Sequence, residues 1–284
     1  MSNKYSHSRI SCFDGCKLKY KYTYHDKITA TGADTKLADK GSALHHTFEA
    51  YKVGDTYETL KALIDKQIEN YKLDPNEYPY EEGIRRFIAF RENWFNPKLE
   101  THKHSHEQWA NGTLVGVPMC GQLDTVLEND NEIIIIDFKS SKSMDTKSYQ
   151  KQLMLYAYLK GTMKKWNIKE IAEKVKLYLF YPFGDVTAKK YDTIEKRALF
   201  CLKQIIFTED DLERVIHEYS KTIKEIQATD FSSITYKDAR ESFACQWCPF
   251  FGSIEDDTIG FAGCKLTYDN GARQLRTTKF YRTQ

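Results

Sequence analysis

The sequence predicts an α/β fold in which a mixed β-sheet is flanked by helices. Residues 60–95 repeat apolar side chains at helical spacing, and residues 114–138 contain short runs rich in β-branched side chains. Residues 148–159 then show a helical pattern, and residues 175–181 read as another strand. We therefore expect a single α/β domain over residues 1–284.

The first predicted helices precede the sheet. Apolar residues recur at steps of three, four and seven in residues 60–71 and 84–95, as one face of a helix requires. A shorter helix is predicted for residues 41–51. We expect residues 55–100 to form a helical insertion in the domain.

The predicted strands begin with an antiparallel meander. Its three runs are residues 114–119, 122–127 and 132–138. The later strand at 175–181 ends in a Pro-Phe-Gly-Asp turn, and residues 186–192 are expected to return as its partner strand. The pattern does not decide the state of residues 197–207.

The last clear element is a helix near the C-terminus. A capping-box-like start at Thr208 precedes apolar residues that keep helical phase as far as Ile226. From about residue 230 the sequence is rich in loop signals and holds three of the seven cysteines. We expect residues 230–284 to form a cysteine-containing, metal-bound lobe.

The composition is that of an ordinary globular protein. Hydrophobic residues make up 41% and charged residues 29% of the 284, with 14 glycines and 6 prolines, which excludes a disordered or low-complexity chain. No apolar run approaches the length of about 18 residues that a spanning helix needs, so we expect no membrane partner. The N-terminus lacks the apolar segment of a secretory signal, which predicts a cytoplasmic location. The net charge of +2 excludes a global basic field.

The densest chemical signal joins two acids and a lysine. Asp124 and Asp137 are separated by twelve residues and lie at or near the ends of two strands expected to be adjacent. Two carboxylates held together need a cation between them, and hard divalent ions such as Mg²⁺ or Mn²⁺ suit such a site. Lys139 projects to the same strand face as Asp137 and can orient an attacking water. The alternative interpretation is a strand end that enters solvent.

These residues belong to a set of motifs that follow one another in a definite order. The set comprises G-x-x-x-H-x-x-x-E at 41–49, G-x-x-D at 121–124, D-x-K at 137–139, Q-x-x-x-Y at 152–156, and a cysteine before an aromatic and basic stretch within 8–20. It resembles the PD-(D/E)xK nuclease superfamily, in particular its RecB-type branch, which includes the AddB nuclease domain and the CRISPR-adaptation exonucleases. The resemblance spans residues 8–264. It implies a restriction-endonuclease-like core, with the catalytic sheet and helix in residues 105–192.

The resemblance also implies roles for individual residues. Those assigned to metal, either Mg²⁺ or Mn²⁺, are His45, Asp124, Asp137 and, through its carbonyl, Phe138. Those assigned to catalysis are Asp124, Asp137, Lys139, Gln152 and Tyr156, the last two by supporting the site and contacting the nucleic-acid backbone. Alternatively, His45 is an ordinary partly buried histidine. Gln152 and Tyr156 alternatively pack their helix onto the sheet.

Glu107 precedes the meander and is a further candidate near the metal. Its neighbours His102, His104 and His106 indicate a merely polar segment, so Glu107 is not included among the predicted ligands. The alternating histidines are themselves a conceivable metal site. Their strand-like spacing on an exposed hairpin favours adventitious binding over a dedicated site.

The cysteines suggest a second cofactor. Seven is an odd number, and in a reducing compartment it favours buried thiols or metal ligands over a disulfide framework. In RecB-type relatives that carry an iron–sulfur cluster, one N-terminal and three C-terminal cysteines hold a [4Fe–4S] centre, and Cys16, Cys245, Cys248 and Cys264 fit this arrangement. Fifteen residues separate Cys248 from Cys264, more than in the relatives, which makes Cys12 the substitute ligand. A structural Zn²⁺ site and reduced buried thiols are the alternatives.

Together these features predict metal-dependent DNA hydrolysis. The resemblance implies an exonuclease for single-stranded ends in recombination, repair or phage DNA processing, with a helicase or recombination protein as a partner. Seven lysines against one acid between residues 139 and 165 suit phosphate contacts. The aromatic residues interleaved with them, which suit stacking on unpaired bases, are Tyr149, Tyr156, Tyr158 and Trp166. Two alternatives remain: a non-catalytic DNA-end-binding scaffold subunit, and a restriction-type endonuclease, which would cut closed circles.

Overall fold

The computed structural model describes most of the chain. The described residues are 4–31, 36–76, 80–187, 190–239, 245, 248–250, 264 and 279–282. The chain divides into two compact units, one formed by residues 36–216 and the other by residues 1–35 together with residues 217–284. The expectation of one nuclease domain over the whole chain stays a prediction.

The larger unit contains a five-stranded sheet with the strand order β2-β3-β4-β5-β6. Its strands are β2 (Lys103–Leu114), β3 (Val117–Glu128), β4 (Ile133–Phe138), β5 (Val175–Phe180) and β6 (Leu202–Ile205). The first three are antiparallel, β4 and β5 are parallel, and β6 returns antiparallel to β5. The parallel step needs a crossover, which α6 (Lys147–Met163) and α7 (Ile168–Lys174) provide. The predicted mixed sheet is confirmed.

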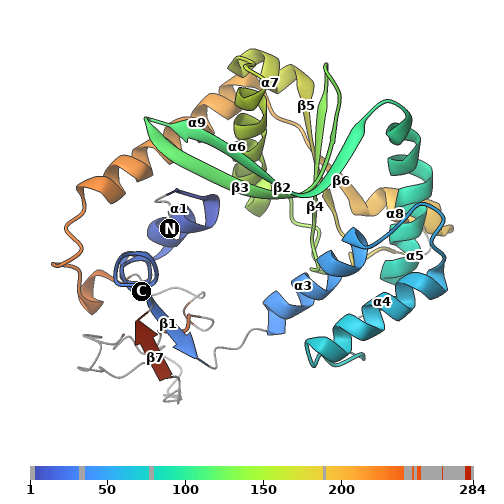
Figure 1. Ribbon diagram of the computed structural model, residues 1–284, viewed down its shortest axis with the longest axis horizontal. Coiled ribbons are helices and arrows are strands. Elements are labelled where there is room, and N and C mark those ends of the chain that lie inside the picture. Colours follow the sequence, from blue (N-terminus) through green and yellow to red (C-terminus); the bar gives the residue numbers. More distant parts are fainter. Residues whose placement is uncertain are drawn as a thin grey trace. The chain divides into compact units, whose positions relative to one another are not determined.

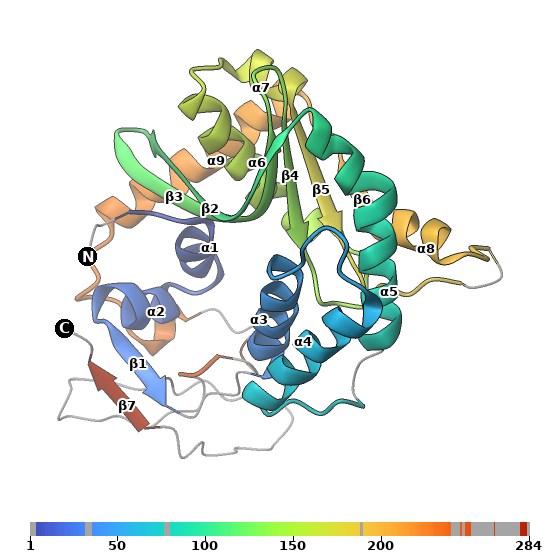
Figure 2. The same cartoon turned by 45° about the vertical axis from the view of Figure 1, so that its right-hand side comes forward.

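Helices lie on both faces of this sheet (Figure 1). On one side is α6, and on the other are α5 (Tyr80–Phe90) and α8 (Ile194–Cys201). Figure 2 shows α3 (Lys36–Glu49) beside α4 (Tyr57–Asn70), which in turn contacts α5. The chain then continues through the π-helical η2 (Arg91–Phe95) and the 3₁₀-helical η3 (Asn96–Glu100). The predicted helical insertion is therefore helical throughout most of its length.

An apolar core fills the space between the sheet and the helices α3 and α5. The ring of Phe48 stacks on that of Phe87 with 3.7 Å between centroids and 5° between planes, and both contact Phe138 of β4. Ile136 belongs to the same core. Because side chains alternate along a strand, Asp137 points to the opposite face of β4, where α6 lies.

The first predicted strand, residues 114–119, is wrong. These residues span the hairpin turn between β2 and β3, where Val115 and Gly116 both have positive φ values of 47° and 77°. Two successive residues with positive φ are typical of the tight turn that matches the twist of a hairpin. The preceding strand instead begins at Lys103, in the segment that contains the alternating histidines.

The predicted return strand at residues 186–192 is also wrong, because none of its described residues belongs to a strand. Carbonyls of the turn before it accept hydrogen bonds from the buried Arg86, whose Nη1 lies 3.1 Å from Pro182 O and 2.7 Å from Gly184 O. The antiparallel partner of β5 comes from the segment that the sequence pattern left undecided. That segment forms the end of α8 and then β6.

The smaller unit holds the remaining elements. These are α1 (His7–Gly15), α2 (Lys17–Tyr20), the π-helical η1 (Lys21–His25), β1 (Ile28–Thr31), η4 (Tyr236–Asp238) and β7 (Lys279–Arg282). Strand β1 pairs antiparallel with β7. The predicted C-terminal helix is α9 (Glu209–Ala228), which passes from the larger unit into this one. Much of the predicted cysteine-containing lobe lies outside the described residues. None of the described helices combines the length and apolar character needed to cross a membrane.

Candidate metal centre

Helix α3 presents two predicted motif residues on one face. Leu44 and Phe48 are buried in the core of the larger unit, which fixes the rotation of the helix. His45 and Glu49, four residues apart, therefore share the adjacent face. The neighbouring His46 is exposed, and its Nδ1 lies 3.3 Å from the hydroxyl of Tyr71.

Strands β3 and β4 bring the two aspartates together. Thr125 of β3 lies opposite Ile136 of β4, so Asp124 and Asp137 stand one position beyond that pair on neighbouring strands. The backbone N–H of Phe138 donates to Asp124 Oδ2 at 2.7 Å, which fixes this carboxylate, from within β3, beside the end of β4. The predicted adjacency of the two acids is therefore observed.

Lys139 follows β4 and is held between two side chains. Its Nζ lies 2.5 Å from Oδ2 of Asp137, a buried carboxylate. The same ammonium lies 4.1 Å from the ring centroid of Tyr149, in cation–π geometry. The positive charge is thus fixed beside the aspartates while its side chain keeps some solvent exposure.

Glu107 occupies an interruption in the β2–β3 ladder. Pairing is continuous on both sides but omits Glu107, whose φ is 49°. His104 and Gln108 are four residues apart, so on a regular strand their side chains would share a face. The His104 ring, however, packs against Phe95 of the insertion. Gln108, by contrast, accepts a hydrogen bond from Lys160 of α6 at 2.8 Å. The strand therefore changes face at Glu107, and left-handed non-glycine residues of this kind concentrate at functional sites.

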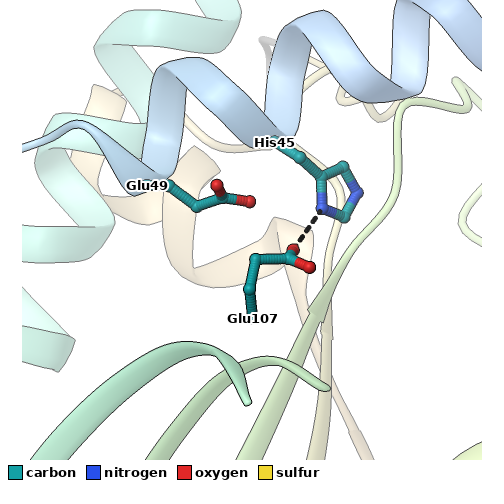
Figure 3. A group of neighbouring side chains, drawn as sticks. All are labelled: His45, Glu49 and Glu107. Carbon is teal, nitrogen blue, oxygen red and sulfur yellow. Dashed lines mark ion pairs between the residues drawn. The ribbon is translucent and has the colours of Figure 1, made fainter. Parts of the chain in front are cut away.

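His45, Glu49 and Glu107 form a compact group of possible ligands (Figure 3). Their ligand atoms lie within 4.8 Å of one another, and within the described chain no other three His, Cys, Asp or Glu side chains do so. His45 Nδ1 is 3.9 Å from Glu107 Oε1 and 3.6 Å from Asp124 Oδ2. These three side chains and that of Asp124 line one cavity of about 650 Å³.

The electrostatics of this group favour a cation. Burial, followed by the charge of Asp137, raises the pKa of Asp124 well above its ordinary value. Burial and the nearby Glu49 raise the pKa of Glu107 to about 7. Burial lowers the pKa of His45, which keeps the imidazole neutral and able to ligate. Crowded carboxylates with a neutral imidazole are a donor set that fits a hard divalent ion such as Mg²⁺ or Mn²⁺.

The predicted Q-x-x-x-Y pair lies on α6 at the edge of the same cavity. Gln152 Nε2 donates to the hydroxyl of Tyr156 at 2.7 Å, and burial raises the pKa of Tyr156 to about 12. A Cβ atom at Gly121 would collide with the Tyr156 ring, so only glycine allows this close approach of β3 and α6. Tyr156 is itself buried, and it lines the cavity.

Two residues of this site were missed or set aside by sequence reasoning. Glu49 appeared only as the end of a motif, and Glu107 was excluded because of its histidine neighbours. Those histidines lie elsewhere: His102 Nε2 is 3.2 Å from Glu132 Oε1, and His106 Nδ1 is 2.7 Å from the Thr125 hydroxyl. The i, i+4 spacing from His45 was a usable signal for Glu49. No local pattern marks Glu107, because its position depends on the broken ladder.

The predicted cysteine ligands and their substitute all lie in the smaller unit, and Cys16, Cys248 and Cys264 pack in or against its core. Cys245 is buried, and its carbonyl accepts a hydrogen bond from the Cys248 N–H at 3.0 Å. Burial raises the pKa of Cys248 and raises that of Cys12 to about 11. Burial thus favours the neutral thiol at Cys12 and Cys248 over the thiolate that binds metal.

Solved structures provide one comparison. A candidate exonuclease from Eubacterium rectale is similar with a TM-score of 0.50 and 12% identity, over 82% of this chain and 83% of that chain. At this identity the likeness concerns the fold alone. The structure of a protein named SSO0001 has 16% identity over 88% of this chain and 96% of that chain. Its TM-score of 0.33 is too low to indicate a shared fold. No curated protein matches the sequence.

A family model provides the decisive comparison. The model of the PD-(D/E)XK nuclease superfamily matches residues 4–252, a span that includes the two aspartates, Lys139 and the α3 motif. The RecB-type branch stays a prediction. Because the match covers most of the chain and agrees with the fold, the protein belongs to the PD-(D/E)XK nuclease superfamily.

Proposed function

We propose that this nuclease is a metal-dependent deoxyribonuclease that removes nucleotides from single-stranded ends. One observation supports the proposal most directly. The ion pair between Asp137 and Lys139 lies on the strand next to Asp124, and Asp124 lines the cavity together with His45, Glu49 and Glu107. A scaffold protein has no need of this complete set, and each member has a chemical use in phosphodiester hydrolysis.

The metal ligands proposed are His45, Asp124, Asp137, the Phe138 carbonyl and, added from the structure, Glu107. A divalent cation held there would polarise the phosphodiester and offset the charge that develops on it. Neutral His45 and the deprotonated acids supply the lone pairs, and the Phe138 N–H keeps Asp124 in place. Glu49 lies close enough to Glu107 to complete the group.

Lys139 is proposed to position the attacking water. Its ammonium is fixed by Asp137 and Tyr149 and can donate a hydrogen bond to the water or to a phosphate oxygen. Gln152 and Tyr156 support this arrangement from α6, because their hydrogen bond and the close contact with Gly121 hold α6 against β3. These two residues also remain the proposed contacts with the nucleic-acid backbone.

The proposed exonuclease activity rests on the resemblance to RecB-type enzymes. The same resemblance supports a role in recombination, repair or phage DNA processing, with a helicase or recombination protein as partner. Two lysines on the first turns of α6, the exposed Lys147 and the half-buried Lys151, suit contacts with phosphate. A restriction-type endonuclease is the competing activity for the same site.

A [4Fe–4S] cluster held by Cys16, Cys245, Cys248 and Cys264 is the second cofactor proposed. The support is that these cysteines, one from the start of the chain and three from its end, lie in one unit, and that Cys16, Cys248 and Cys264 pack in or against the same core. Soft thiolates suit both iron–sulfur clusters and zinc, so Zn²⁺ is the competing occupant. Cys12 is the substitute for Cys264.

The test of function compares end-labelled linear single-stranded DNA with circular single-stranded DNA, in Mg²⁺ or Mn²⁺. We expect progressive loss of the linear strand and survival of the circle, and no turnover by Asp137→Asn. Cleavage of the circle would replace the exonuclease with an endonuclease. Undiminished turnover by folded Asp137→Asn would remove the site altogether.

A further inference from the structure

Trp109 follows Glu107 by two residues on β2, and its side chain is largely exposed to solvent. Its exposed fraction is 55%, whereas the other two described tryptophans have partners: Trp94 stacks on Phe90 at 5.5 Å and Trp166 lies 5.0 Å from the Lys174 ammonium. Within the part of the chain that the structure describes, no ring or cation pairs with Trp109. Isolated exposed aromatics are common on proteins, so its position rather than its exposure carries the argument.

The register places Trp109 on the cavity side of the hairpin. It lies directly opposite Gln122 of β3, and opposite residues in an antiparallel pair share a face. Gln122 lines the cavity and donates a hydrogen bond to the carboxylate of Glu107. On the other face, Gln108 contacts Lys160 of α6, as alternation requires. Trp109 therefore shares its face with Gln122, next to the ligand group.

The distance along the strand is short. Trp109 follows Glu107 by two residues on β2, which corresponds to about 7 Å of strand. A polynucleotide strand whose phosphate sits at the metal group would thus have a neighbouring base within reach of the indole. Gln122 lies between the indole and the ligand group, because it is opposite Trp109 and donates a hydrogen bond to Glu107.

Three of the four aromatic residues that the sequence offered for stacking have partners within the protein. The Tyr149 ring faces the Lys139 ammonium, and Tyr156 is 7% exposed against Gly121. Trp166 is occupied by Lys174. A neutral indole beside a cavity rich in carboxylates can bind a base without the repulsion that a phosphate meets there.

We propose that Trp109 stacks on an unpaired base of the strand being cleaved and thereby selects single-stranded over duplex substrate. This inference rests on the proposed nuclease function. Stacking needs a free base face, which a base inside a duplex does not offer, and it tolerates any base sequence. Loss of one stacked base corresponds to about 5- to 150-fold in affinity.

The test is a cycle that alters both partners of the stack. Trp109→Ala, Trp109→Phe and the control Met163→Ala, which removes an exposed apolar side chain from α6, are each made in full-length Asp137→Asn protein so that no strand is cut. Binding to fluorescein-labelled single-stranded DNA, the same strand with abasic sites, and blunt duplex is measured by anisotropy. Circular dichroism confirms that each variant is folded.

We expect Trp109→Ala to weaken binding to the normal strand by about 5-fold or more, to leave the abasic strand and duplex unchanged, and to be largely rescued by Trp109→Phe. Met163→Ala should bind as its parent does. Equal weakening on normal and abasic strands, or no weakening, would overturn the stacking role. Failure of the parent to bind single-stranded DNA would also overturn it. Binding with the expected cycle but no turnover by the wild type would overturn the nuclease proposal alone.

Discussion

The pH dependence of metal binding tests the electrostatics of the site most directly. Burial and the nearby Glu49 raise the pKa of Glu107 to about 7. Burial and the charge of Asp137 raise the pKa of Asp124 as well. A carboxyl group must lose its proton to ligate a cation. We therefore expect Mn²⁺ affinity to increase with pH, and we expect the part of the increase that comes from Glu107 to end once that carboxyl is ionised.

The magnitude follows from proton linkage. Below its pKa of about 7, Glu107 gains a factor of ten in protonation for each pH unit. One displaced proton therefore lowers the apparent affinity by about tenfold per pH unit. His45 adds less to the slope than an exposed histidine would, because burial lowers its pKa. In the metal-free protein these two carboxyls act against stability as the pH rises. Their ionisation lowers the free energy of unfolding from about pH 4, where they ionise in the unfolded chain, through their raised folded pKa values.

The assay is calorimetric titration of Mn²⁺ between about pH 5.5 and 8, in buffers of different ionisation enthalpy so that released protons are counted. Glu107→Gln keeps the side-chain size and removes one titrating group, so it should release about one proton fewer than the wild type near pH 6. Identical proton release by wild type and Glu107→Gln would refute the assignment of the raised pKa to a metal ligand.

The remaining predictions concern catalysis, packing and the cysteines. Asp137→Asn and Lys139→Ala should each lower turnover by about 10²-fold or more, measured in single-turnover assays, and near-normal turnover in a folded variant would exclude that residue. Gly121→Ala should destabilise the folded protein by about 1–3 kcal/mol, measured by urea unfolding, because the added Cβ meets the Tyr156 ring. The control Gly41→Ala should leave stability unchanged or increase it, because a Cβ there meets no atom within 4 Å. Cys248→Ser should lose iron and acid-labile sulfide from anaerobically purified protein; wild type containing zinc and no sulfide would contradict the cluster.

Local pattern was sufficient for much of the fold. The helices of the insertion and the strand Ile133–Phe138 obey spacing rules that operate within a few residues, and the structure confirms them. The pattern failed where a distant contact decides the conformation. The segment after β5 forms no strand in its described residues, because Arg86 of another helix binds the carbonyls that lead into it.

For the site, the sequence by itself determined the motif residues His45, Asp124, Asp137 and Lys139. Helical and strand periodicity dictate which side chains share a face, and the hairpin brings the two acids together. Only the tertiary structure decided the place of Glu107 and the neighbouring Trp109. Glu107 lies 3.9 Å from His45 at a break in the β2–β3 ladder, where its backbone is left-handed. Local propensity does not predict this break, because steric clashes make a left-handed backbone uncommon for a residue other than glycine.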